Sequence, residues 1–440
     1  AGSAGPRPGH AAGTPPGWAE AASARGVVVS GTGAQRALSV SYLLAATAGG
    51  TGRHVAMLAG GCAARGAVVH VYGPADPAAP RVAAPRPGWD FSTVHIAVRP
   101  RPARDAAAVL RLRRLLARDT PDVLHAHGLR AGALAALALA MPGRPGTALA
   151  VTVHNAPPAG GPAAAVYAGL ELIVARRADA VLTVSGDLDG RLHRRGARLA
   201  GRALVPAPAA AGASPAEIAA VRREVEGGAP LGSGPGGSGP GGSGSGSGGN
   251  GPGGSGPAHR ELVVGVGRLA AQKDFATLIR AAARWQRRRT VPLLLIAGEG
   301  PLEAELRRQA AAAGVPVRFL GLRRDVPALL AAADVVVVPS TWEGQPLIVQ
   351  EALRAGRPLV ATSAAGITGL TGDDGALLVP PGDAEALAAA VIGLLDDPGA
   401  ATRLAVAARA RAARLPTETA AVDQVLRLYQ RLRSPGKGRP

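Results

Sequence analysis

Ser340-Thr-Trp-Glu-Gly-Gln-Pro-Leu-Ile-Val-Gln-Glu-Ala352 is the stretch that decides how this chain is expected to fold. It follows the apolar, β-branched run Val335–Val338, which is typical of a fully buried strand. Pro346 suits the first turn of a helix, and Gly356 suits the residue at which a helix stops. The sequence therefore predicts a strand, a short loop and a short helix.

Two carboxylates lie in this unit, Glu343 in the loop and Glu351 inside the expected helix. The N-terminus of a helix favours anionic groups such as phosphate. Carboxylates beside it can accept hydrogen bonds from the hydroxyl groups of a sugar or a ribose. Glutamates eight residues apart also occur on ordinary helix surfaces, so the spacing alone leaves a plain surface pair open.

The unit resembles the Glu-x7-Glu motif of the retaining glycosyltransferases of family 4. The matching residues are Glu343, Gly344, Pro346, Glu351, Ala352 and Gly356. The resemblance implies an α/β protein of GT-B architecture, in which two Rossmann-like domains with parallel sheets face each other across a cleft. It also implies that Glu343 contacts the donor sugar, that Glu351 binds the nucleotide ribose, and that Leu347 and Ile348 belong to the donor site.

The chain is long and basic. Its 440 residues leave room for two or three domains, and 49 basic against 30 acidic residues give a formal charge of +19. A basic surface favours anionic partners, namely nucleotide sugars, anionic lipid or nucleic acid. Aromatic residues make up only 2% of the chain and leave little for base stacking, so we expect no nucleic acid. Cys62 is the single cysteine, which rules out an internal disulfide and fits a reducing cytoplasm.

Membrane contact is expected to be peripheral at most. The longest apolar run, Ala131–Met141, is too short to span a bilayer. Residues 1–25 lack the hydrophobic segment of a signal peptide, and we expect residues 1–36 to be a disordered tail. A helix is expected over Arg104–Arg118, with an apolar face and an arginine face. That basic face could be simply solvated, or it could touch an anionic membrane at the inner face.

The first half of the chain offers two ligand-facing stretches. Gly49-Gly50-Thr51-Gly52 follows an expected strand and precedes a helix, an arrangement that lets backbone approach phosphate, although a plain turn is an alternative. Thr152-Val153-His154-Asn155 ends another strand, where open parallel sheets place ligand contacts. His154 could instead merely cap that strand. The resemblance implies that Gly49 and Gly50 lie near the donor phosphates and that His154 lies near the anomeric carbon.

Metal chemistry has one candidate. His125 and His127 lie two residues apart, so they share one face of an expected strand and could ligate a metal. No third ligand follows at a convincing spacing, and the resemblance implies a metal-independent enzyme. We therefore expect no metal and no cofactor other than a nucleoside diphosphate sugar, which is the donor substrate. Fixed cations would then stabilise the leaving diphosphate.

Those cations are expected in the second half of the chain. Arg268 and Lys273 lie in a loop between the expected strand Leu262–Gly267 and a helix, and such a pair can clamp a diphosphate. Solvated loop charges are the alternative, and the resemblance favours the diphosphate. Asp274 suits the N-cap of the helix, although the family usually has glycine there. The loop Ser363–Thr368 also departs from the family, which more often shows a Gly-Gly pair and a proline.

The expected domains follow from composition. Residues 227–258 are almost pure glycine, serine and proline, which cannot bury apolar area, so we expect a flexible linker there. It would separate an acceptor-side domain, residues 37–226, from a donor domain, residues 259–414. The resemblance implies that a helix within residues 415–440 returns to the first domain.

The function expected is transfer of a sugar from a nucleoside diphosphate sugar to an unidentified acceptor, with retention of configuration. Two alternatives remain open. One is a nucleotide-sugar epimerase or hydrolase on the same fold, which would turn over donor without acceptor. The other is a non-catalytic basic module that binds nucleic acid or membrane, which would not compete with a nucleoside diphosphate.

Overall fold

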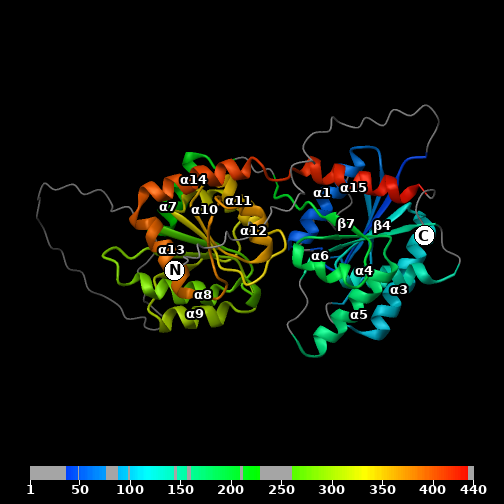
Figure 1. Ribbon diagram of the computed structural model, residues 1–440, viewed down its shortest axis with the longest axis horizontal. Helices are drawn as coiled ribbons and strands as arrows, with labels where there is room; N and C mark the ends of the chain where they lie inside the picture. The colour runs from blue at the N-terminus through cyan, green and yellow to red at the C-terminus, as the bar shows by residue number, and fades with distance from the viewer. Residues whose placement is uncertain are drawn as a thin grey trace, which may run out of the picture.

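Two parallel β-sheets form the centres of two α/β domains (Figure 1). The computed structural model describes residues 36–47, 49–75, 88–97, 100–142, 146–155, 160–208, 212–227 and 260–434. The expected N-terminal tail, residues 1–36, and the expected linker, residues 227–258, lie outside the described residues except for one residue each. The two-domain α/β architecture with parallel sheets, predicted from the sequence, is confirmed.

The first sheet has the order β3-β2-β1-β4-β5-β6-β7 among the described residues. Its strands are β1 Ser39–Leu44, β2 Val68–Gly73, β3 Trp89–Thr93, β4 Val123–His127, β5 Ala148–Val153, β6 Ala180–Thr183 and β7 Leu199–Arg202. Its helices are α1 Gly49–Ala63, α3 Pro102–Asp119, α4 Leu129–Ala140, α5 Gly161–Arg177 and α6 Gly186–His193. The strand order reverses between β1 and β4, and such a switch point is where ligands bind at the carboxyl ends of parallel strands.

The second sheet has the order β10-β9-β8-β11-β12-β13 among the described residues. Its strands are β8 Leu262–Val266, β9 Leu293–Ala297, β10 Val317–Phe319, β11 Val335–Val338, β12 Leu359–Thr362 and β13 Leu377–Val379. A 3-10 turn, η2 Ala271–Lys273, follows β8. The helices are α8 Phe275–Trp285, α9 Glu303–Ala312, α10 Val326–Ala332, α11 Leu347–Ala355, α12 Ala365–Thr371, α13 Ala384–Asp396 and α14 Pro398–Ala412. The order reverses between β8 and β11, the two strands that precede Lys273 and Glu343.

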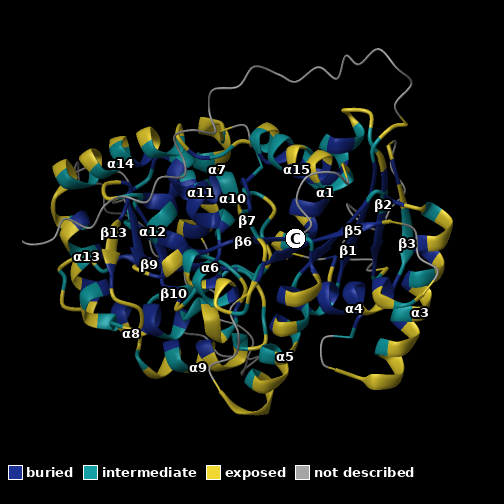
Figure 2. Ribbon diagram, turned by 45° about the vertical axis from the view of Figure 1, so that its right-hand side comes forward, coloured by how far each residue is buried: buried dark blue, intermediate teal, exposed yellow. Residues whose placement is uncertain are grey.

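Burial explains why these segments fold as they do. The central strands are buried along their whole length because helices cover both faces of a parallel sheet. Figure 2 shows buried strands inside and exposed outer faces on the helices. In α8 the side chains of Leu278, Ile279 and Ala282 are fully buried, while Arg284 on the opposite face is exposed.

Helix α7, Pro215–Gly227, moves the domain boundary from where composition placed it. Val221 and Val225 are buried in the core of the second domain, and Arg222 binds Asp334 with both Nη2–Oδ distances at 3.1 Å. The Gly/Ser/Pro tract therefore lies between two elements of one domain, α7 and β8. The chain first crosses between domains before α7, downstream of β7.

Helix α15, Glu418–Arg433, crosses in the other direction. Figure 1 shows this C-terminal helix, in red, beside the N-terminal helix α1, in blue. Val422, Val425 and Tyr429 are buried in the first-domain core. Gly61 makes this approach possible, because a Cβ there would lie 2.3 Å from Val422 Cγ2. Each domain therefore packs a helix that arrives from the other side of the boundary.

Candidate active site

The unit β11–loop–α11 has the strand, loop and helix that the sequence predicted. β11 is buried at every position, and α11 ends at Gly356, whose φ of 59° is left-handed. Pro346 is the residue just before the helix rather than part of its first turn. Its fixed φ sets the angle at which the chain enters α11.

Glu343 lies in this loop and is only 5% exposed. Its carboxylate accepts a hydrogen bond from the Ser340 hydroxyl at 2.7 Å and forms an ion pair with the Lys273 ammonium. Lys273 follows β8 and Glu343 follows β11, which are neighbours in the sheet. A buried carboxylate requires such partners. The structure thus joins two residues that the sequence had assigned to separate parts of one donor site.

Glu351 is the fifth residue of α11 and is half-buried. Burial raises the pKa of its carboxyl, and the nearby Arg53 and Arg354 guanidinium groups oppose that rise. Arg53 belongs to α1 of the first domain, so the field at Glu351 has a contribution from across the boundary. This basic neighbour was not singled out from the sequence.

The start of α11 lies against the first domain. Leu347 packs on the core of the first domain, whereas Ile348 is buried in the core of the second. A Cβ at Gly50 would lie 3.9 Å from Leu347 Cδ1, so the glycine pair and the motif helix are neighbours. Gly49 begins α1 with a φ of 79°, a conformation that favours glycine.

His154 follows β5, as expected, and belongs to a cluster of four histidines. Its Nε2 lies 3.0 Å from His127 Nδ1, and the two rings stack with centroids 5.2 Å apart. Burial lowers the pKa of His154 to about 4. Burial, with the neighbouring histidines, lowers the pKa values of His54 and His127 well below the usual range. These imidazoles are therefore neutral at pH 7.

His125 has a different task. Its Nδ1 lies 2.6 Å from the Tyr429 hydroxyl and its Nε2 lies 2.8 Å from Thr152 Oγ1, so both ring nitrogens are engaged. Burial lowers its pKa to about 3. His125 thereby binds α15 to the first sheet. Within the described part of the chain, no three His, Cys, Asp or Glu side chains are arranged to hold a metal ion.

The motif loop also touches the first domain directly. Trp342 Nε1 donates to Asp187 Oδ2 of α6 at 3.0 Å. A Cβ at Gly344 would lie 2.4 Å from Val184 Cγ2 and 3.5 Å from the His154 carbonyl oxygen. Only glycine fits at this contact. Glu343 and His154 therefore occupy opposite sides of one close interdomain contact.

The loop before α8 contains Asp274, at the position where the family usually has glycine. Asp274 has φ 46° and ψ 44°, a left-handed conformation in which glycine is usual. Its carboxylate accepts hydrogen bonds from Thr277 N at 3.2 Å and Thr277 Oγ1 at 2.6 Å. Asp274 is thus the N-cap that the sequence predicted, and its carboxylate is hydrogen-bonded to the first turn of α8. Arg268 is exposed in the same loop, and Lys273 is its last helical residue before the cap.

The loop Ser363–Thr368 supports the motif from behind. Helix α12 begins at Ala365, so most of this loop is helical. A Cβ at Gly366 would lie 1.8 Å from the Gly344 carbonyl oxygen and 2.3 Å from that of Glu343. The glycine that remains here is therefore the one that the close approach requires.

Comparison with known proteins supports this site. Residues 48–200 match the model of "Glycosyltransferase Family 4", and residues 260–397 match that of "Glycosyl transferases group 1". The two matched regions contain His154 and the pair Lys273–Glu343. The chain carries the domains of a GT-B glycosyltransferase of family 4 type.

Curated relatives of this family match part of the chain. It is 33% identical over 179 residues to alpha-D-kanosaminyltransferase of Streptomyces kanamyceticus, which covers 39% of this chain and 46% of that protein. It is 41% identical over 155 residues to glycogen synthase of Mycobacterium tuberculosis, covering 33% of this chain and 36% of that protein. The chain thus spans less than half the length of these relatives.

Solved structures of other proteins share the fold. Anabaena HepE, in complex with UDP and glucose, has a TM-score of 0.69 at 18% identity, covering 90% of this chain and all of that one. Sucrose-phosphate synthase from Thermosynechococcus elongatus has a TM-score of 0.70 at 22% identity, covering 90% of this chain and 99% of that one.

Across the described ranges, no helix combines the length and apolarity that crossing a membrane demands.

Several residues of this candidate site were missed from the sequence. Ser340 lies two residues after the last residue of the buried strand β11, and that position was the available signal. Asp187, Gln345 and Gln350 carried none, because their partners lie more than 130 residues away along the chain. Such contacts depend on how the two domains meet, which local patterns do not encode.

Proposed function

We propose that this protein transfers a sugar from a nucleoside diphosphate sugar to an acceptor hydroxyl, with retention of anomeric configuration. The bond between the anomeric carbon and the diphosphate breaks, and a bond from the acceptor oxygen to that carbon forms. The diphosphate leaves with the bonding electron pair, and the acceptor proton is released.

One observation carries the proposal: the ion pair of Lys273 and Glu343 at the carboxyl ends of two adjacent strands, beside the contact of Gly344 with the His154 backbone. An ammonium group has three donors, so Lys273 can hold Glu343 and a phosphate oxygen at once. The Glu343 carboxylate keeps accepting capacity for a sugar hydroxyl beside that phosphate. The two groups therefore suit the two ends of the bond that breaks.

The remaining roles follow from position. Glu351 would accept from the ribose hydroxyls, and Leu347, Ile348, Gly49 and Gly50 would line the donor site. Arg268 would join Lys273 on the diphosphate, because its exposed guanidinium can present a planar fork to phosphate. His154, neutral at pH 7, would act near the anomeric carbon as a hydrogen-bonding group rather than as a cation. These fixed groups would stabilise the developing charge without a metal.

Peripheral contact with an anionic membrane remains part of the proposal. On α3 the residues Leu112, Leu115 and Leu116 are buried, while Arg104, Arg111 and Arg114 are exposed. The exposed arginines would attract anionic headgroups. Sedimentation with vesicles of phosphatidylglycerol and of phosphatidylcholine tests this, and equal binding to both would contradict it.

The donor is found first by thermal shift with UDP, GDP, ADP and dTDP, because a ligand that binds the folded state raises the unfolding temperature. The matching nucleotide sugars are then incubated with acceptor candidates, and release of nucleoside diphosphate is followed. Proton NMR of the product compares the anomeric configuration with that of the donor. Inverted product would overturn retention, and donor turnover that never depends on an acceptor would indicate a hydrolase or epimerase instead.

A further inference from the structure

The segment that connects the domains, residues 203–208, is mostly buried although it belongs to no strand. Its first N–H, that of Ala203, donates to the Thr183 carbonyl at the end of β6 at 2.8 Å. The segment follows β7 and carries two prolines, Pro206 and Pro208. Buried backbone N–H and C=O groups must find partners. Here side-chain amides supply them.

Two glutamines of the Glu-x7-Glu motif bind one edge of the segment. Gln345 Oε1 accepts from Val205 N at 3.0 Å, and its Nε2 donates to the Ala203 carbonyl. Gln350 Oε1 accepts from Ala207 N at 2.9 Å, and its Nε2 donates to the Val205 carbonyl at 2.8 Å. Each amide bridges the N–H of one residue and the C=O two residues earlier, as an adjacent parallel strand would.

Arg354 extends the same edge. Its Nη1 donates to the Ala207 carbonyl at 2.7 Å and to the Pro208 carbonyl at 2.9 Å. The Ala203 carbonyl and both backbone groups of Val205 and Ala207 are therefore satisfied by side chains of the α11 unit, which belongs to the second domain.

The opposite edge is bound from the first domain. Gln424 of α15 accepts from Leu204 N at 3.0 Å and donates to the Arg202 carbonyl at 2.7 Å. The pattern is again one N–H and the C=O two residues earlier. The segment is thus held between a helix that packs on the first sheet and a motif that belongs to the second.

We propose that Gln345 and Gln350 are positioning residues that fix the first domain, and with it His154, relative to Glu343 and Glu351. Gln345 lies two residues after Glu343, and Gln350 directly precedes Glu351. The spacer of the motif thereby sets the interdomain geometry. Separating the domains here requires these amides, or that of Gln424, to leave buried backbone groups without partners.

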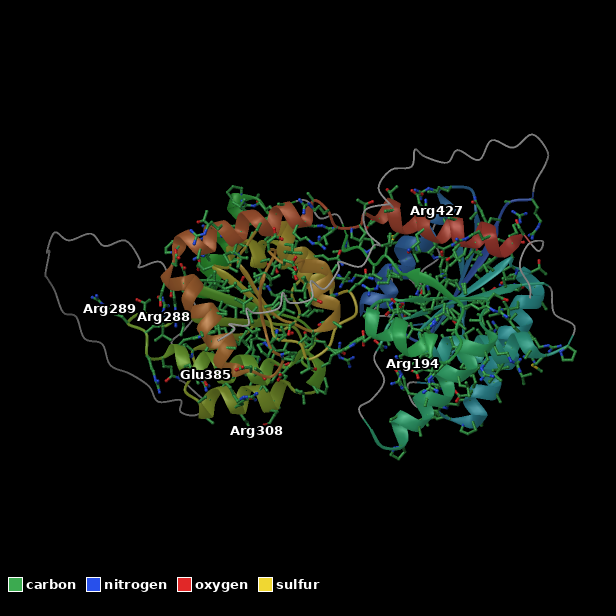
Figure 3. All side chains as sticks on the ribbon, in the orientation of Figure 1. Arg194, Arg288, Arg289, Arg308, Glu385 and Arg427 are labelled. Carbon is green, nitrogen blue, oxygen red and sulfur yellow. The ribbon has the colours of Figure 1, made fainter. Side chains whose placement is uncertain are left out.

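The first test measures geometry and needs no activity. Spin labels are attached at Arg194→Cys on the first domain and Arg308→Cys on the second, both on outer surfaces (Figure 3). Cys62 is buried and stays unlabelled. The parent should give one narrow interdomain distance, and Gln345→Leu with Gln350→Leu should broaden it. Gln309→Leu is the matched control, because Gln309 bonds Ala276 within the second domain.

A second readout separates positioning from folding. The expected loss of turnover rests on the proposed function, whereas the expected change in distance does not. The dissociation constants of UDP and GDP should change less than threefold, since Lys273 and Arg268 both belong to the second domain. Turnover should fall at least tenfold. Gln350→Glu, which keeps the acceptor for Ala207 N and loses the donor to Val205, serves if the leucine variant fails to fold. An unchanged distance distribution in a folded variant would overturn the proposal.

Discussion

The Glu343 carboxylate is nearly excluded from water, and its two partners decide what it can do. Ser340 donates from the same loop after β11, and Lys273 contributes a full charge from the loop after the neighbouring strand β8. Hydrogen bonds to charged groups are worth about 1.5–3 kcal/mol each. Removing either partner would lose part of that stabilisation. Substitutions at Glu343 and Lys273 must therefore preserve the shape of the side chain to be informative.

Glu343→Gln and Glu351→Gln should fail differently. The first should lower kcat, because the proposed partner of Glu343 is the sugar whose bond breaks. The second should mainly raise the KM for donor, because Glu351 would bind the ribose equally in the ground and transition states. Losses of about ten- to a hundredfold are expected from the energy of one charged hydrogen bond. Steady-state kinetics of both variants measures this, and full activity in both would remove the motif from the mechanism.

Arg268 and Lys273 should discriminate a nucleoside diphosphate from the bare nucleoside. Arg268→Ala and Lys273→Gln should each weaken the diphosphate about ten- to a hundredfold and leave the nucleoside unchanged, because only phosphate meets the cations. Lys273→Gln keeps a donor for Glu343. Calorimetric titration with both ligands makes the comparison, with Arg308→Ala on exposed α9 as control (Figure 3). Equal losses of affinity for the diphosphate and the nucleoside would show that the two cations do not bind the phosphates.

Asp274 combines a left-handed backbone with an N-cap, and substitutions separate the two. Asp274→Ala loses a cap worth about 1 kcal/mol and puts alanine where the left-handed conformation costs about 1–2 kcal/mol. Asp274→Gly loses the cap but removes that strain, so it should be nearly neutral. Urea unfolding of both variants gives the order. The cap was predictable from the sequence, whereas the φ of 46° was not, because aspartate rarely adopts it.

At the scale of elements, the strand, loop and helix around Glu343 followed from local patterns. A β-branched run, a proline and a glycine stop are short-range signals, and the structure contains the elements they predict. The contacts of Tyr429 with His125 at 2.6 Å and with Tyr42 at 3.1 Å were out of reach, since they join α15 to strands some 300 or more residues earlier in the chain. Their hydrogen bonds exist only once α15 lies on the first domain.

The buried histidines of this region predict a pH dependence of stability. Burial depresses the pKa of His125 to about 3 and that of His154 to about 4, against 6.5 when unfolded. Between these values the unfolded chain binds more protons, so stability rises with pH. The contribution is fully present above pH 6.5 and is lost as pH falls toward 4. Urea unfolding at pH 7.5, 6.5 and 5.5 measures the decline.

The variant His125→Asn should flatten that decline, because it removes one group that must be neutral to stay buried. His193→Asn, on an exposed end of α6, controls for the loss of a histidine as such. The carboxyl groups whose pKa values are lowered, such as Asp325 beside Arg323, contribute only at more acidic pH. A decline of the same slope in His125→Asn and the parent would contradict this origin.

At the scale of the whole molecule, the two domains are tied by more than one connection. Helix α7 packs on the second sheet, α15 packs on the first, and residues 203–208 are bound from both sides. Composition revealed the Gly/Ser/Pro tract, and the number of α/β domains was correct. It could not show that the tract separates α7 from its own sheet, because that depends on which core buries Val221 and Val225.

This exchange of helices predicts that the chain survives a cut between α7 and β8. A specific protease site introduced near residue 243 would yield an N-terminal piece that carries α7 and a C-terminal piece that carries α15. Because α7 belongs to the second core and α15 to the first, the pieces should co-elute on size exclusion and separate only in denaturant.

Val225→Asp should let the two pieces separate more readily, since it places a charge in the second core. Asp423→Ala, which removes only the half-exposed ion pair with Arg65, serves as the mild control on α15. Two pieces that separate in native buffer, each folded alone, would show that the helices contribute little to holding the domains together.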